Sequence, residues 1–379
     1  MSHKQPGQPP SGAIDRLLGA PPFGLSDEDK RPLFAAAMAE AFRHHFENNE
    51  LFRTHCRKLG LAPELEAPDP GLYPYLPAAV FKSGLLVSVP ADRLTAEVHS
   101  SATSGAPSRI AVDRTTAKRQ SLVSSRVMAE YLGHHRRPFL IADADPGAST
   151  GREIPARAAA ARGFLVFADA VDYAFGEDGG RLVTDPGRLC GILERLERSG
   201  CDVCVFGFTH LLYTKLIKPL QEMGKMFSLP PGSRVALIGG WKRLRDERVT
   251  REVFGEAVRR TLAVPDDSVI DFYGFTEQMG LVYGGAGRGP KTVSAYAEII
   301  IRDFDTLRPA PDGREGLVQV LTPVPHSYPG ISVLTDDVGR ILGRGRDESG
   351  RWGTRFEILG RAESAEARGC GNIPPPAGR

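Results

Sequence analysis

A polar segment at residues 100–109 has the residue types and the spacing that can bind a phosphate. Hydroxyl and small residues fill it, and a charged side chain comes only at its end, at Arg109. Apolar-alternating runs at 96–98 and 110–112 predict a strand on each side of a tight loop. Hydroxyls and backbone N–H groups of such a loop can point toward one anion, so we expect it to bind a nucleotide phosphate through Ser101, Thr103, Ser104 and Gly105. The same residue types also fill ordinary turns, and the Gly-Lys-Ser/Thr ending of a P-loop is missing.

Three later segments place further polar side chains after short apolar runs. Residues 271–277 read Asp-Phe-Tyr-Gly-Phe-Thr-Glu, residues 332–340 contain two adjacent aspartates, and residues 360–364 begin with Gly-Arg. A carboxylate such as Glu277 is an oxygen ligand of the kind that Mg²⁺ prefers. The carboxylate of Asp337 can accept two hydroxyl donors at once.

In this order the four segments resemble the motif series of the adenylate-forming superfamily, the acyl- and aryl-CoA ligases and their relatives. The resemblance implies that the Ser/Thr/Gly loop holds the phosphates of ATP and that Tyr273 and Gly274 flank the adenine. It also implies that Thr276 lies near the α-phosphate and that Glu277 binds Mg²⁺. Asp337 would hold the ribose hydroxyls, and Arg361 would contact ribose or phosphate at the hinge that follows.

A narrower resemblance is carried by residues 81–83, 239–242, 327–330, 334–339 and 367–370. These segments read Phe-Lys-Ser, Gly-Gly-Trp-Lys, Ser-Tyr-Pro-Gly, Leu-Thr-Asp-Asp-Val-Gly and Ala-Arg-Gly-Cys. They look like the acyl-protein synthetases, the fatty-acid-activating ligases of the bacterial luminescence fatty acid reductase complex. That resemblance implies activation of a fatty acid by ATP to an acyl-adenylate, followed by acyl transfer to Cys370. The thioester would then pass to a partner protein, such as a reductase or a carrier protein.

The resemblance leaves one cation to be found. Superfamily members continue past the Gly-Arg hinge into a domain that supplies a catalytic lysine, whereas no lysine follows Gly360 in this sequence. The carboxylate and the triphosphate repel one another as they react, so fixed cations must offset their charge. Lys82 and Lys242 are the candidates, and a solvated surface lysine is the alternative for each. Arg109 could also supply the charge, and a strand arginine that points to solvent is its alternative. Its neighbour Ser108 stands where many related ligases have a lysine, and the Gly239–Gly240 pair could line the nucleotide.

Two alternative functions remain open at this stage. The first is an acid–CoA ligase or an amide-forming biosynthetic ligase. The second is a non-catalytic subunit that binds nucleotide and serves as a scaffold, which the missing lysine would favour. The presence of Glu277, Asp337 and the Ser/Thr/Gly loop favours an enzyme.

Composition and patterning predict an α/β protein. The chain has 379 residues, 41% of them hydrophobic, and a net charge of +2, so no nucleic-acid partner is indicated. No run is long and apolar enough for a membrane span, and no signal sequence is evident, so a cytoplasmic location is expected. Five cysteines indicate no disulfide framework. We expect the pair at 201 and 204 to be buried strand thiols.

Strand-like and helical runs alternate from residue 84 to about 285, which predicts mostly parallel sheets layered with helices. The strand-like runs are residues 139–142, 164–167, 203–206, 235–238 and 269–270. Short strand-like runs separated by Pro and Gly after about 291 predict a smaller antiparallel β part; these runs are residues 298–301, 317–321, 332–334 and 356–359. We therefore expect an adenylate-forming N-domain whose C-terminal domain is absent or rudimentary. The predicted ranges are a disordered or extended tail at 1–24, an α/β nucleotide-binding core at 25–290, an antiparallel part of the same domain at 291–359, and a short remnant at 360–379.

Overall fold

The structure is a computed structural model that describes residues 12–65, 69–100, 106–146, 161–240 and 249–362. The chain forms two compact units, each assembled from separate segments. Unit 1 comprises residues 1–123, 275–281 and 292–379, and unit 2 comprises residues 124–274 and 282–291. Among the described residues, no helix has the length and apolar character that a membrane crossing requires.

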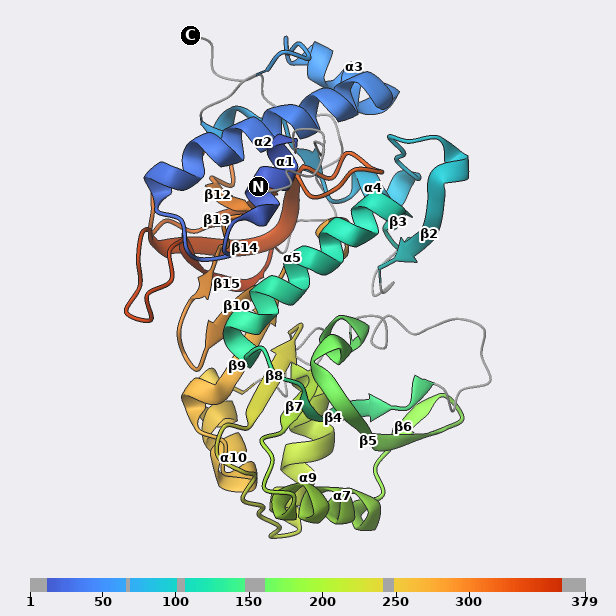
Figure 1. Ribbon diagram of the computed structural model, residues 1–379, viewed down its shortest axis with the longest axis vertical. Coiled ribbons are helices and arrows are strands. Elements are labelled where there is room, and N and C mark those ends of the chain that lie inside the picture. Colours follow the sequence, from blue (N-terminus) through green and yellow to red (C-terminus); the bar gives the residue numbers. More distant parts are fainter. Residues whose placement is uncertain (1–11, 66–68, 101–105, 147–160, 241–248, 363–379) are drawn as a thin grey trace, which may run out of the picture. The chain divides into compact units, whose positions relative to one another are not determined.

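Unit 1 contains an antiparallel sheet with helices from the N-terminal part of the chain (Figure 1). Its helices are α1 (Ala13–Gly19), α2 (Asp27–Asn48), α3 (Glu50–Lys58), η1 (Pro70–Leu72), α4 (Val80–Ser83), η2 (Ala91–Arg93) and η8 (Thr276–Gln278). Its strands are β1 (Leu76–Pro77), β2 (Leu94–His99), β3 (Arg109–Asp113), β12 (Glu298–Arg302), β13 (Gly316–Leu321), β14 (Ser332–Gly343) and β15 (Arg355–Arg361). Strands β12, β13, β14 and β15 pair antiparallel in that order, and β1 pairs parallel with β14.

Helix α2 follows from local sequence signals. The Ser26 hydroxyl accepts a hydrogen bond from the Asp29 backbone N–H at 3.1 Å, and acidic residues occupy the first turn, where the helix dipole favours negative charge. Its buried face carries Phe34, Met38 and Phe42 at helical spacing. Local sequence signals therefore account for where α2 begins and which face it buries.

Unit 2 is built on a mostly parallel sheet with the strand order β10-β9-β8-β7-β4-β5-β6. Within it, β4 pairs parallel with β5 and β7, and β8 pairs parallel with β7 and β9; β10 and β6 are antiparallel to their neighbours. The strands are β4 (Arg137–Ala144), β5 (Ala168–Asp178), β6 (Arg181–Val183), β7 (Cys204–Phe208), β8 (Arg234–Ile238), β9 (Val269–Tyr273) and β10 (Tyr283–Ala286). The helices are η4 (Leu165–Phe167), α7 (Pro186–Arg198), α8 (Thr209–Leu211), η5 (Leu212–Ile217), α9 (Lys218–Glu222), α10 (Arg251–Leu262) and η7 (Asp266–Ser268). Helix α5 (Arg114–Leu132) and the two-residue strand β11 (Lys291–Thr292) each contain a boundary between the units.

Helices α7, α9 and α10 cover one face of this sheet (Figure 1). Alternate strand residues such as Leu140, Val205 and Val235 pack with these helices in one buried cluster. The other face carries aromatic side chains, where the rings of Phe164 and Phe206 lie 4.2 Å apart between centroids. Helices therefore layer a parallel sheet whose strands are buried, and the predicted fold class is confirmed.

Three local predictions were wrong. Residues 164–167, expected as a strand, belong to a helical segment that includes η4, because a short apolar run does not by itself distinguish a strand from a buried helix. Part of the expected tail forms α1, whose Ile14, Leu17 and Leu18 side chains are buried. Cys204 is buried in β7 as expected, but Cys201 is exposed.

Candidate active site

The best-defined contact of the candidate site joins two predicted motifs. The Ser108 hydroxyl donates a hydrogen bond to Glu277 Oε1 at 2.5 Å, although the two residues are 169 positions apart in sequence. Ser108 is fully buried and Glu277 is 8% exposed. Ser108 immediately precedes β3, and Glu277 lies in the single turn η8. The end of the phosphate-loop segment and the predicted magnesium ligand are therefore brought together inside unit 1.

The predicted phosphate loop is closed at its base. The Ser100 N–H donates to the Ser108 carbonyl at 3.0 Å, and the Ser108 N–H donates to Ser100 Oγ at 2.8 Å. Strands β2 and β3 on either side pair antiparallel, as the sequence predicts. The proposed phosphate ligands Ser101, Thr103, Ser104 and Gly105 lie outside the described residues, so their role stays a prediction.

Tyr273, predicted to flank the adenine, and the Gly239–Gly240 pair, predicted to line the nucleotide, lie at strand ends in unit 2. Tyr273 ends β9, is half-buried, and packs on Tyr283 with the ring centroids 6.0 Å apart. Gly239 follows β8 with a φ of +72°, a conformation that favours glycine, and its carbonyl accepts a hydrogen bond from the Thr209 hydroxyl at 2.6 Å. Gly240 comes next and is exposed. Because β8 and β9 are parallel neighbours, their carboxyl ends, and with them the Gly239 turn and Tyr273, lie at one edge of the sheet.

The predicted ribose-binding residues form a pair across two strands of unit 1. Asp337 on β14 stands opposite Arg361 on β15, and Arg361 Nε lies 3.3 Å from Asp337 Oδ1. The Asp337 N–H donates to the Thr335 hydroxyl at 3.2 Å within β14. The Asp337 carboxylate therefore has a cationic neighbour that would orient it, and Arg361 is 66% exposed at its side chain.

The residues proposed to replace the missing catalytic lysine differ in whether their charge is already paired within the protein. Arg109 binds Glu97 through two contacts, from Nε to Oε1 at 2.6 Å and from Nη2 to Oε2 at 3.1 Å, so its charge already has a partner. Lys82 is exposed at the end of the short helix α4, and no ion pair involves it within the described part of the chain. Lys242 lies outside that part, as does the proposed acyl acceptor Cys370.

The residues around Glu277 fit a magnesium ion. The Ser108 hydrogen bond uses Oε1, and no hydrogen bond to Oε2 is found among the described residues. The fully buried Tyr328 lies near Glu277 and next to Gln120. Its hydroxyl has no hydrogen-bond partner among the described residues. Burial and the Glu277 charge raise the pKa of this phenol, so it stays protonated. A carboxylate with hydroxyl neighbours is an oxygen donor set suited to Mg²⁺, so Glu277 is the residue that would hold it.

Sequence reasoning missed the structural partners of the predicted residues. A buried lysine, Lys291, donates to the Asp271 carboxylate at 2.7 Å, and Arg251 lies 2.9 Å from the same carboxylate. Asp271 lies on β9 two residues before Tyr273, so this ion-pair cluster supports the strand that ends at the predicted adenine contact. The Asp271 and Tyr273 spacing was visible in the sequence, but nothing there indicated which cations would pair with the aspartate.

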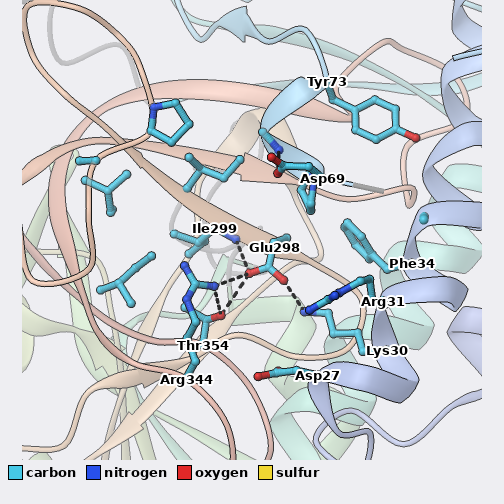
Figure 2. Close-up of a pocket in the computed structure, with 18 residues that line it drawn as sticks. Asp27, Lys30, Arg31, Phe34, Asp69, Tyr73, Glu298, Ile299, Arg344 and Thr354 are labelled. Atoms are coloured by element: carbon cyan, nitrogen blue, oxygen red, sulfur yellow. Dashed lines mark hydrogen bonds and ion pairs between the residues drawn. The ribbon is translucent and has the colours of Figure 1, made fainter. Parts of the chain in front are cut away.

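A separate cavity in unit 1 involves none of the predicted site residues. It has a volume of about 300 Å³ and is lined by α2, η1 and β12 (Figure 2). Figure 2 shows Lys30 pointing toward Glu298, with Nζ and Oε2 3.0 Å apart, and Arg344 and Thr354 on the other side of the same carboxylate. Lys30 also donates to the Ala297 carbonyl at 2.7 Å, so these charges pair with groups of the protein itself.

The fold defined by these elements is that of the adenylate-forming ligases. A crystal structure of 2-hydroxyisobutyryl-CoA ligase, in an open conformation with an acyl-AMP and CoA, superposes with a TM-score of 0.66 at 14% sequence identity. The match covers 95% of this chain and 81% of that one. At this identity the likeness concerns the fold alone.

Within that class the family is defined by sequence. The profile of the family described as acyl-protein synthetase, LuxE, matches residues 9–374, and the chain belongs to this family. A long-chain-fatty-acid–luciferin-component ligase of Vibrio harveyi is 25% identical over 358 residues, which is 94% of this chain and 91% of that protein. A protein of the same name from Aliivibrio fischeri is 25% identical over 367 residues, covering 95% and 93%. The resemblance inferred from the motifs is thereby confirmed.

Proposed function

We propose that this protein uses ATP to activate a fatty acid as an acyl-adenylate and then transfers the acyl group to a protein thiol. The observation that carries the proposal is the Ser108–Glu277 contact, which joins the end of the phosphate-loop segment to the predicted metal ligand in a buried setting. Family membership supports the reaction class, and the names of the two relatives support a long-chain fatty acid as the substrate.

The proposed reaction has two displacement steps. In the first, a carboxylate oxygen of the acid attacks the α-phosphorus of ATP, a P–O bond forms, and pyrophosphate leaves. In the second, a thiolate sulfur attacks the acyl carbonyl carbon, a thioester forms, and AMP leaves. A bound magnesium ion supplies charge that offsets the repulsion between the two anionic reactants.

Named residues of the chain would carry these steps. Glu277 would hold the magnesium, Asp337 the ribose, and Tyr273 with Gly274 the adenine. Gly239 and Gly240 would line the nucleotide. Ser101, Thr103, Ser104 and Gly105 would bind the phosphates, with Thr276 near the α-phosphate. Lys82 and Lys242 remain the proposed cations for the reacting carboxylate, because Arg109 is already paired with Glu97.

Detection of the products tests this proposal. The full chain is incubated with ATP, Mg²⁺ and a series of fatty and aromatic acids, and mass spectrometry measures acyl-adenylate before any acceptor is added. We expect acyl-adenylate with fatty acids and its consumption when a thiol-bearing acceptor protein is supplied. Acyl-CoA formed equally well from added CoA would favour the acid–CoA ligase alternative. ATP binding without acyl-adenylate from any acid would contradict the proposal and favour the scaffold alternative.

A further inference from the structure

Ser108 has three hydrogen bonds that link separate parts of unit 1. Its hydroxyl donates to Glu277 Oε1 at 2.5 Å, its N–H donates to Ser100 Oγ at 2.8 Å, and its carbonyl accepts from the Ser100 N–H at 3.0 Å. The residue is fully buried, and its hydrogen bond to Glu277 is shielded from water. One residue, through its backbone and its hydroxyl, therefore ties the base of the predicted phosphate loop to the carboxylate on η8.

The surroundings leave the Glu277 turn little room to move. A Cβ at Gly330 would lie 2.3 Å from Tyr328 Cε2 and 3.0 Å from the Glu277 carbonyl oxygen, so only a glycine lets these segments approach so closely. The side chain of the next residue, Gln278, is buried and donates to the carbonyls of Val320 and Gly330 at 3.0 and 2.8 Å. The backbone at Glu277 is thus anchored, and the Ser108 hydrogen bond is what fixes the carboxylate at the end of its side chain.

The chemistry of a hydroxyl suits this task better than that of a cation. A serine hydroxyl donates one hydrogen bond to one carboxylate oxygen and adds no charge. The carboxylate therefore keeps its full negative charge, and its second oxygen remains for a metal ion. A lysine at the same position would form an ion pair with Glu277 and compete with a bound cation for it. Carboxylates that bind metals are commonly held by such hydrogen bonds, and loss of the supporting partner weakens metal binding.

We propose that Ser108 is a positioning residue that orients the Glu277 carboxylate so that its second oxygen binds the magnesium ion accompanying ATP. The inference rests on the proposed function, because it takes Glu277 as the metal ligand. Ser108 itself touches neither ATP nor the acid in this account, and it acts through Glu277.

Manganese binding provides a test that does not depend on turnover. Electron paramagnetic resonance of free Mn²⁺, titrated into the full chain with ATP, measures the metal dissociation constant. We expect Ser108→Ala to raise that constant about 10-fold, the effect typical of lost supporting hydrogen bonds. We expect Ser108→Thr, which keeps the hydroxyl, to restore most of the affinity. Ser233→Ala removes another buried serine hydroxyl, one that donates to the Pro230 carbonyl, and serves as the matched control.

A double variant separates positioning from general damage to the fold. If Ser108 acts through Glu277, Ser108→Ala combined with Glu277→Gln will bind Mn²⁺ no more weakly than Glu277→Gln alone. Unchanged affinity in Ser108→Ala, or additive losses in the double variant, would overturn the inference. A wild-type chain that binds Mn²⁺ with ATP yet forms no acyl-adenylate would overturn the proposed function while leaving the role of Ser108 supported by the variants.

Discussion

The described cysteines differ in the exposure of their thiols, and burial shifts the thiol pKa of two of them. Burial raises the pKa of both Cys56 and Cys204 to about 12, so these thiols stay protonated and unreactive near neutral pH. Cys190 is half-buried on α7, and Cys201 is exposed. Two of the described cysteines are thereby excluded as acyl acceptors, which strengthens the case for testing Cys370 first.

Acylation of Cys370 is predicted at the residue scale. After incubation with ATP and a fatty acid, the intact protein is expected to gain the mass of one acyl group, and hydroxylamine should remove it because the bond is a thioester. Cys370→Ser should abolish the adduct. Cys201→Ser removes an exposed thiol outside the matched motif and should leave the adduct unchanged. An adduct that persists in Cys370→Ser would place the acceptor elsewhere.

Only the candidate site residues that belong to recognisable motifs could be predicted from the sequence. Glu277, Asp337 and Tyr273 were found because several short motifs occur in a known order. Their partners were not found, since Ser108 and Glu277 are far apart in sequence and one sequence carries no information on which distant residues pair. The pairing of Arg109 with Glu97 was missed for a related reason, because their separation along the chain hid their cross-strand contact in the β2–β3 pair.

At the element scale, the contact between helix α2 and strand β12 is the feature whose energetics are clearest. Strand β12 is at an edge of its sheet, and an exposed edge presents unpaired backbone groups. Lys30 of α2 caps the Ala297 carbonyl next to this edge, while Glu298 accepts a hydrogen bond from the Ile299 N–H at 3.1 Å. The Lys30–Glu298 pair therefore both holds α2 against β12 and satisfies two backbone groups, the Ala297 carbonyl and the Ile299 N–H.

Removal of one partner of this pair is expected to be costly. Lys30→Met should lower the free energy of unfolding by about 3 kcal/mol, because the buried Glu298 carboxylate would lose its nearest cation and keep only Arg344, whose Nη1 lies 4.0 Å away. The double variant Lys30→Met/Glu298→Leu should be more stable than Lys30→Met, since no unpaired charge is left. Urea unfolding of the three proteins measures this, and a double variant less stable than Lys30→Met would contradict the explanation.

The Lys30–Glu298 pair should also make the free energy of unfolding depend on pH. Burial tends to raise the pKa of Glu298, but the charge and hydrogen bond of Lys30 outweigh it, so the pKa lies below its ordinary value of 4.5. The stability that the pair provides is therefore complete above pH 4.5 and is lost as the pH falls through the folded-state pKa. The difference in unfolding free energy between the wild type and Lys30→Met should shrink as the pH is lowered below 4.5. A difference that stays constant would contradict this assignment.

Secondary structure elements were predicted best where apolar alternation was strong. Strands β4, β7, β8, β9, β12, β13 and β14 coincide with apolar runs identified in the sequence, and the change from parallel to antiparallel pairing after residue 291 was foreseen. The run at 164–167 was misassigned because its burial comes from packing of Phe164 on Phe206 and Phe272, a tertiary effect that local pattern does not reveal.

At the scale of the whole molecule, the chain passes back and forth between its two units. The boundary falls between Gly274 and Phe275, so the segment 271–277 contributes Tyr273 to unit 2 and Glu277 to unit 1. The predicted ranges 25–290 and 291–359 are contiguous, whereas unit 1 is assembled from three separate segments. A division of that kind depends on contacts between distant segments, which composition and periodicity do not show.

The central claim is that this chain forms acyl-adenylates at a site organised by Glu277. The measurement that tests it most directly is fatty-acid-dependent exchange of labelled pyrophosphate into ATP, in the wild type and in Glu277→Gln, with the exposed Glu222→Gln as control. We expect acid-dependent exchange in the wild type and in the control, and a loss of about 100-fold in Glu277→Gln, corresponding to about 3 kcal/mol of transition-state stabilisation. Wild-type protein without acid-dependent exchange, or Glu277→Gln exchanging at the wild-type rate, would contradict the claim.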